Sequence, residues 1–341
     1  IDGNTNTQKD RAGLRLIPMS EVMIREVKVV TSGYAPEFGQ TTGMVYNAIT
    51  PSGTNTFKGS ASFRFRRKPF TAYPFFFQGP KTDETKPDTT INTYTAEAGG
   101  PIVRDRLHFF GGFESTFRDL AYQRIMQITP ANAAALGLEP QPASVPWTQT
   151  AHFYIGKLDY QMGMNHRLTG RFVRFSNDSP YNNGGGLSAL ETTNDYLDAM
   201  DSVAVQMNST FGSNKLNELR VQYAFRENER FPNADSGTGV PTTVSGIATF
   251  GGPTSNGSYF LQGITQVIDN FTWLVGNHNF KFGFDAQFIH DERTTALYYS
   301  YTFATINAYL AAVNGTSPRG YTSFRQVLGQ PDFQMDSKLY G

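Results

Sequence analysis

The chain of 341 residues contains no cysteine. This excludes disulfide frameworks, thiolate zinc sites, iron–sulfur clusters and cysteine nucleophiles. The net charge is zero, because 29 basic residues balance 29 acidic ones. Without a basic excess there is no bulk electrostatic attraction to nucleic acid, and we expect no nucleic-acid partner. Charged residues make up only 17% of the chain, and about 25% is usual for a soluble domain.

Several local signals are also missing. No run of 18 or more apolar residues is present, so no transmembrane helix is expected. The chain starts at Ile1 without an initiator Met or a basic leader, which we interpret as the inside of a longer protein. There is no HExxH, GxSxG or P-loop motif, and the five histidines are scattered. We therefore expect no enzyme, no cofactor and no metal.

What the chain does contain is aromatic residues and glycine. Phe, Tyr and Trp together reach 14%, with 28 Phe and 17 Tyr, and there are 33 Gly. This composition is typical of β-structure with many turns. The mean hydropathy of −0.39 is compatible with a membrane barrel, in which only alternate residues of each strand face lipid.

From Phe57 onward the residues alternate with a period of two. In residues 57–66 aromatic and small side chains occupy one face, and Lys, Ser and Arg occupy the other. Such alternation indicates half-buried strands. Nine are expected, at 57–66, 93–101, 106–115, 149–161, 166–176, 199–212, 215–228, 259–275 and 278–291. Several reach the length of about 9–11 residues that a tilted membrane-spanning strand needs.

The connections between these strands alternate in length. Long ones are expected at 67–92, 116–148, 177–198, 229–258 and 292–333, and the connections between them are short turns. Short periplasmic turns and long extracellular loops are typical of an outer-membrane β-barrel. The expected fold is therefore all-β, a partial transmembrane antiparallel barrel at 57–341. Residues 1–55 read instead as a small mixed unit of short strands and turns on the periplasmic side.

Four segments resemble Oar-like TonB-dependent receptors of Gram-negative outer membranes. They are VKVVTSGYAPEFGQ at 27–40, GMVYNAITPSGTN running into FKGS at 43–60, GGPIVRDRLHFFG at 99–111 and NFKFG at 279–283. In this family the first two segments end the plug domain and open barrel strand one. The family usually has Asn where Tyr46 or its neighbour Asn47 stands, and Lys where Pro51 stands, and these departures are minor.

The resemblance implies that residues 1–55 are the C-terminal part of an α/β plug and that 57–341 hold about 9–10 of an expected 22 barrel strands. It implies an N-terminal carboxypeptidase-regulatory-like domain outside this chain, and a TonB complex that pulls on the N-terminal region. Outer-membrane lipid and an unidentified small ligand, peptide or glycan are the other implied partners. Leu339, Tyr340 and Gly341 look like the start of a tenth strand.

Candidate site residues are few. Arg64 and Arg66 form a basic stripe on a lumen face, and the aromatic residues of the first long loop, Tyr73, Phe75, Phe76 and Phe77, are candidate ligand contacts. Glu191, Asp195, Asp198 and Asp201 form an acidic run that matches no EF-hand spacing, so a solvated loop is expected there. A short packing helix is expected within 302–314. Phe63, Phe65, Phe282 and Phe284 are expected to face lipid, with Arg64, Lys281 and Asp285 inward.

Three functions stay open at this point. The first is a TonB-dependent importer that captures a scarce ligand at its extracellular loops. The second is a surface protein on the same scaffold, used for adhesion, signalling or protein export. The third, a soluble secreted β-domain, is disfavoured by strand length and by the one-sided placement of the long loops.

Overall fold

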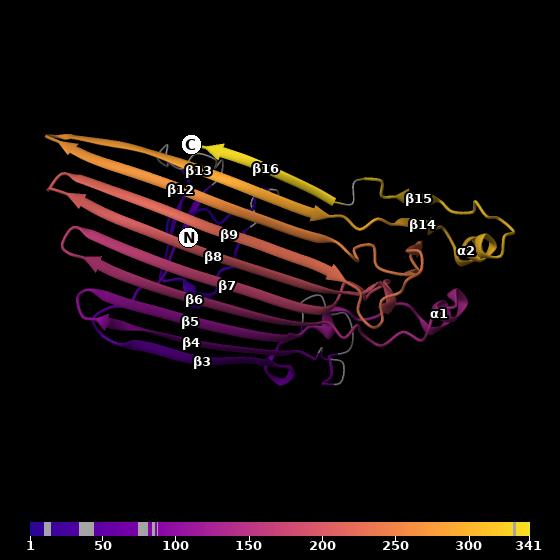
Figure 1. Cartoon of the computed structure of the whole chain (residues 1–341). Helices are drawn as coiled ribbons and strands as arrows, with labels where there is room; N and C mark the ends of the chain where they lie inside the picture. Colours follow the sequence, from indigo (N-terminus) through magenta and orange to yellow (C-terminus); the bar gives the residue numbers. More distant parts are fainter. Residues whose placement is uncertain (10–14, 34–43, 74–80, 84–85, 87, 330–331) are drawn as a thin grey trace.

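The computed structural model describes residues 1–9, 15–33, 44–73, 81–83, 86, 88–329 and 332–341. Ten long strands form one antiparallel sheet in the order β16-β13-β12-β9-β8-β7-β6-β5-β4-β3 (Figure 1). Their bounds are β3 Lys58–Arg67, β4 Thr90–Val103, β5 Leu107–Asp119, β6 Thr148–Met162, β7 His166–Asn182, β8 Asn194–Phe211, β9 Lys215–Phe231, β12 Tyr259–Val275, β13 His278–Thr294 and β16 Asp332–Tyr340. Within the described strands, β3 and β16 do not pair, so the sheet is an open part of a barrel wall.

All nine predicted strands are present, most of them longer than expected. The tenth strand, β16, runs from Asp332 to Tyr340, so the expectation that it starts at Leu339 was wrong by seven residues. Its nine residues pair with β13, from Ala286↔Tyr340 to Thr294↔Asp332. Phe333, Met335 and Leu339 alternate with Asp332, Gln334, Asp336 and Lys338, so a period of two is present before the expected start at Leu339, and the pairing with β13 shows the strand.

The two ends of the sheet differ, as the loop lengths predicted. At one end the strands are joined by turns of two to three residues, and each turn contains a residue with positive φ, namely Asp105, Gly163, Gly212 and Gly276. A left-handed residue is what such tight turns require, and Gly has no Cβ to oppose it. At the other end lie the long loops with α1 and α2 (Figure 1).

The outward face of the sheet carries an apolar band. Phe63, Phe282 and Phe284 are each 51% to 58% exposed, as expected for side chains that have no protein beyond them. Between 11 and 14 residues from the short turns at Gly163, Gly212 and Gly276, the outward face carries ion pairs: Arg174 pairs with Asp201, and His290 pairs with Asp336. Ten residues at 3.3 Å each, tilted by about 40°, rise about 25 Å, which is the height of the lipid-facing band of an outer-membrane barrel.

The described parts of residues 1–55 (1–9, 15–33 and 44–55) lie against the opposite, inward face of the sheet (Figure 1). They contain the 3-10 helix η1 (Glu21–Met23) and an antiparallel pair, β1 (Glu26–Val30) with β2 (Val45–Ile49). Leu16, Ile17 and Met23 are at most 2% exposed and pack with inward residues such as Val173 and Ile264 into one hydrophobic core. Burial of apolar surface therefore fixes this segment to the wall.

The long loops fold into a second unit with its own core. It holds a four-stranded sheet in the order β11-β10-β14-β15, made of β10 Thr242–Val244, β11 Ala248–Phe250, β14 Tyr299–Phe303 and β15 Ser323–Gln326. Two short helices, α1 (Pro130–Leu136) and α2 (Ile306–Val313), cover it. The expected helix in 302–314 is confirmed as α2, whereas α1 and this sheet were not expected. The short 3-10 helices are η3 Lys68–Phe70, η4 Ala121–Gln123 and η5 Leu190–Thr192.

Among the described residues, no helix has the length and apolar character needed to cross a bilayer.

Candidate functional site

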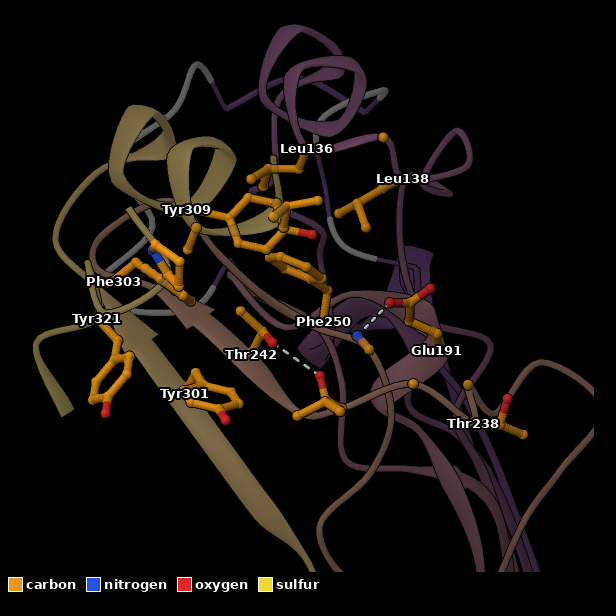
Figure 2. A pocket seen from close by; sticks show the side chains of 18 residues that line it. Leu136, Leu138, Glu191, Thr238, Thr242, Phe250, Tyr301, Phe303, Tyr309 and Tyr321 are labelled. Carbon is orange, nitrogen blue, oxygen red and sulfur yellow. Dashed lines mark hydrogen bonds between the residues drawn. The ribbon is translucent and has the colours of Figure 1, made fainter. Parts of the chain in front are cut away.

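A cavity of about 630 Å³ lies in the folded loop unit, between one face of the small sheet and the two helices (Figure 2). The sheet contributes Thr242, Phe250, Tyr301 and Phe303, and α2 contributes Tyr309. The other lining residues are Leu136, Gly137, Leu138, Glu191, Gly237, Thr238, Gly239, Val240, Gly251, Ala312, Val313, Pro318 and Tyr321. Its volume is in the range of about 300–1,000 Å³ that small-ligand sites occupy.

The aromatic wall of the cavity follows from strand register. Thr242 pairs with both Phe250 and Tyr301, so these three side chains emerge on the same face of the sheet. The ring of Tyr309 packs edge-on against Phe250 at 5.2 Å and against Phe303 at 5.5 Å between centroids. Helix α2 is held in place at its start by Thr305, whose hydroxyl accepts a hydrogen bond from the Ala308 N–H.

The floor of the cavity is backbone. Gly251 has φ +97°, and a Cβ added there would lie 2.1 Å from the Val240 carbonyl oxygen. A Cβ on Gly239 would similarly lie 2.9 Å from the Gly251 carbonyl oxygen. Only glycine permits these two chain segments to approach so closely. The two segments, which also contribute Thr238 and Val240 to the lining, therefore form one closely packed side of the cavity.

One carboxylate supplies the only charged side chain in the lining. Glu191 accepts a hydrogen bond from the Gly251 N–H and stands at the cavity edge (Figure 2). No Lys, Arg or His is among the described residues that line the cavity. Burial, together with the nearby Glu191 charge, raises the pKa of the Tyr309 hydroxyl above its usual value. The cavity is thus apolar and aromatic, with a negative bias.

Four rings continue outward from the cavity as an exposed aromatic terrace, made of Tyr299, Tyr301, Tyr321 and Phe324. Phe324 lies 5.1 Å from Tyr301 and 6.4 Å from both Tyr299 and Tyr321 between centroids. Tyr299 and Phe324 remain 46% and 44% exposed. Tyr301 and Tyr321 belong to both the terrace and the cavity, so the two surfaces are continuous.

A buried ion pair joins the N-terminal residues to the wall. Oδ2 of Asp2 lies 2.6 Å from Nη1 of Arg171 and 3.9 Å from Nζ of Lys157. Thr50 donates to both oxygens of Asp2, through its N–H at 2.8 Å and its hydroxyl at 2.7 Å. Burial alone raises the pKa of the Asp2 carboxyl, but the two cations and the Thr50 hydrogen bonds outweigh it and hold that pKa below its usual 3.8.

Glutamine side chains of the wall extend this contact through backbone groups. The N–H groups of Thr5 and Lys9 donate to Gln266 and Gln262, and Gln222 donates to the Thr5 carbonyl. Glu21 of η1 pairs with Arg64 on β3. Residues 1–55 are thereby tied to strands from β3 to β12.

The candidate ligand contacts predicted from the sequence lie outside the cavity, as far as the structure describes them. Arg64 contacts Glu21 and Glu114 on the inward face, and Arg66 is exposed near the loop end of β3. Tyr73 donates its hydroxyl hydrogen to the Thr82 carbonyl within its own loop. Phe75 and Phe76, with Phe77, lie outside the described residues. None of the three described candidates lines the cavity, and their role as ligand contacts stays a prediction.

The acidic run is not the solvated loop that the sequence suggested. Asp198 forms a two-point ion pair with Arg226 at 3.0 Å, and Asp201 pairs with Arg174 at 3.2 Å. Asp195 accepts from the Tyr181 N–H, and Glu191 holds Gly251. Because side chains alternate between the two faces of a strand, Asp198 and Asp201 lie on opposite faces and pair with different arginines. In the described part of the chain, no group of three or more His, Asp or Glu could hold a metal.

The cavity itself was missed by sequence reasoning. Its aromatic residues lie in segments that the sequence identified only as long connections, where no periodicity marks which residues will meet. The usable signals were the glycines at 237, 239, 251 and 252, which indicate close backbone approach.

A family described as the outer membrane beta barrel domain matches residues 49–143 and 120–338. The chain belongs to this family, and it is a protein of the outer membrane. This confirms the fold class and the location that the strand pattern predicted.

Among curated proteins, the chain is similar to the TonB-dependent transporter Oar of Myxococcus xanthus, with 26% identity over 211 residues. That match covers 56% of this chain and 19% of the relative, so the chain spans a small part of that protein's length. This confirms the resemblance to the Oar-like type.

Two solved structures share the fold. The outer membrane transporter YddB from Escherichia coli superposes with a TM-score of 0.59 at 14% identity, covering 92% of this chain and 40% of that one. The E. coli ferric-catecholate import receptor Fiu, in its open form, gives a TM-score of 0.50 at 15% identity, covering 96% and 58%.

Proposed function

We propose that this chain is the C-terminal part of a plug, residues 1–55, and the first ten strands of the barrel of a TonB-dependent outer-membrane transporter. The observation that carries the proposal is the Asp2–Arg171 contact, with the core around Leu16 and Met23, through which described parts of residues 1–55 pack on the inward face of the wall. A transporter needs such an obstruction, and a wall used only for adhesion does not.

In this proposal the long-loop end is extracellular and the short-turn end is periplasmic. The cavity between α2 and the small sheet then opens on the cell exterior, where it captures the ligand. Energy from the TonB complex changes the contact between residues 1–55 and the wall, and the ligand passes inward. The role is transport, not catalysis.

A labelling experiment in intact cells tests orientation. Because the chain has no cysteine, single cysteines can be introduced at Leu328, 80% exposed at the loop end, and at Met164, 96% exposed in a short turn. A membrane-impermeant maleimide should label Leu328→Cys in intact cells and Met164→Cys only after the outer membrane is opened. The reverse pattern would invert the proposed topology.

The same approach tests transport. Ala48 is 1% exposed beneath the wall, so Ala48→Cys should stay unlabelled until the plug moves. We expect its labelling to rise in energised cells that have TonB and to stay low in cells that lack it, with Met164→Cys in permeabilised cells as the control for reagent access. Equal labelling in both strains would favour the surface-protein alternative, in which residues 1–55 are a fixed structural part.

A further inference from the structure

We propose that the loop cavity and its aromatic terrace bind an extended peptide that carries a free amine and an aromatic or aliphatic side chain. The proposal rests on the proposed function only in taking the loop end as the ligand-binding side. Three features of the described residues support it: the charge of the cavity, its shape, and the free edge of the strand beside the terrace.

The charge selects against anions. Glu191 is the one charged side chain in the lining, and no cation is present there among the described residues to balance an acidic ligand. One of its oxygens is held by the Gly251 N–H, which fixes the carboxylate in place. An ammonium group near Glu191 gains from the opposite charge, and a ligand carboxylate or phosphate is repelled.

The shape fits side chains of a peptide. The apolar wall of Phe250, Phe303 and Tyr309 surrounds a space large enough for one bulky side chain and its neighbours. Tyr301 and Phe324, with centroids 5.1 Å apart, offer a second ring surface outside the mouth. Rings of this kind hold aromatic side chains in offset or edge-to-face contact.

The third feature is strand β15, which forms one edge of the four-stranded sheet of the loop unit. Among the described strands β15 pairs only with β14, and all four of its residues are exposed. Its outer N–H and C=O groups are therefore available to a peptide that adds as a further strand. Phe324 pairs with Tyr301, so it lies on the terrace face. Alternate side chains of an added strand would point to that face and reach the cavity mouth.

A series of peptides with the same sequence and different N-terminal charge tests the proposal. Phe-Gly-Phe amide would be compared in three forms, with a free amine, an N-acetyl cap and an N-succinyl cap, by isothermal titration calorimetry on the purified full-length gene product in detergent. We expect the free amine to bind most tightly, and about tenfold more tightly than the succinyl form, because the Glu191 carboxylate attracts the ammonium and repels the succinyl carboxylate; the neutral N-acetyl form controls for acylation of the amine. Chitotriose serves as the glycan arm and should not compete.

Two isosteric variants locate the effect. Glu191→Gln keeps an acceptor for the Gly251 N–H and should remove the preference for the amine over the acetyl form. Glu139→Gln is the matched control, since Glu139 is exposed in the same loop unit but does not line the cavity. An unchanged preference in Glu191→Gln, tighter binding of the succinyl form, or binding of chitotriose alone would each overturn the proposal.

Hydrogen exchange at β15 gives an independent readout. The free-amine peptide should slow exchange of the 323–326 amides, whereas the succinyl peptide at equal concentration should not. If these amides are already protected without peptide, another part of the protein covers the edge and the proposal fails. TonB-dependent labelling of Ala48→Cys is unaffected by this result, so failure of the peptide site is distinguishable from failure of the transport proposal.

Discussion

Asp2 and Arg171 are separated by 169 positions in the sequence and by 2.6 Å in the structure, and together they join residues 1–55 to the barrel wall. The Arg171 side chain is only 3% exposed, and that of Asp2 is 16% exposed. A charge buried to this degree depends on its partners, and without Arg171 the Asp2 carboxylate would keep only the more distant Lys157 as counter-charge. Under the proposed function, release of residues 1–55 would have to separate or rehydrate this pair.

The first prediction concerns the pair itself. Arg171→Ala should weaken docking of residues 1–55 by about 1.5–3 kcal/mol, the usual contribution of a hydrogen bond to a charged group, because Lys157 and Thr50 still stabilise the Asp2 carboxylate. Limited proteolysis of residues 1–55 in the assembled protein measures the docking. The matched control is Arg174→Ala on the same strand, whose side chain is 50% exposed and faces outward; about 0–1 kcal/mol is expected there. Equal proteolysis of the two variants would contradict the prediction.

The second prediction is a pH dependence with a definite sign. The pKa of Asp2 is held below its usual 3.8 in the folded state. Its contribution to docking is therefore fully present above pH 3.8 and is lost as the pH falls through the lower, folded pKa. A spin label at Lys28, an exposed residue of β1, should become mobile on acidification below pH 3.8. Asp2→Asn should lack this transition; an identical transition in that variant would assign it to another group.

The third prediction fixes which face of the sheet meets lipid. Spin labels at Phe63, Phe65, Phe282 and Phe284 should be accessible to oxygen and shielded from a water-soluble nickel chelate. Labels at Arg64, Lys281 and Asp285 should show the opposite behaviour, because a strand alternates faces at every residue. The adjacent positions Phe284 and Asp285 form the most stringent comparison. Reversed accessibility at this pair would mean that the register is shifted by one residue.

The fourth prediction compares two glycines that both have positive φ. Gly246→Ala, at φ +70° with nothing within 4 Å of the added Cβ, should cost only the left-handed backbone energy of about 1–2 kcal/mol. Gly251→Ala adds a contact of 2.1 Å with the Val240 carbonyl oxygen, so the cavity floor has to move. Hydrogen exchange over residues 237–252 should rise far more in Gly251→Ala. A similar rise in both variants would show that the close backbone approach is unimportant.

The fifth prediction separates stability of the loop unit from recognition. Phe250 is 5% exposed and packs on Tyr309, so Phe250→Ala should destabilise the loop unit by about 3–5 kcal/mol. Phe324 is 44% exposed, so Phe324→Ala should change stability by about 0.5 kcal/mol or less while weakening peptide binding. Hydrogen exchange of the loop unit and calorimetry measure the two effects. The barrel should remain heat-modifiable in both variants.

The sequence alone determined the barrel wall. The nine expected strands are present because a strand with one face toward lipid and one toward the interior must alternate its side chains, and this alternation is local and readable. The ends of the strands were less predictable: β7 continues to Asn182 and β8 begins at Asn194. There the strands extend beyond the apolar band, so the outward face is polar and the alternation disappears.

The tertiary structure decided every contact between segments that lie far apart in the sequence. The ion pair of Asp2 with Arg171, the different partners of the four residues in the acidic run, and the cavity between β11, β14 and α2 join segments that are distant in sequence. No local pattern encodes such contacts, because each arises only after the wall has set the loops side by side. Local periodicity therefore determined the wall, and packing between distant segments decided where this protein holds residues 1–55 and where it forms a cavity.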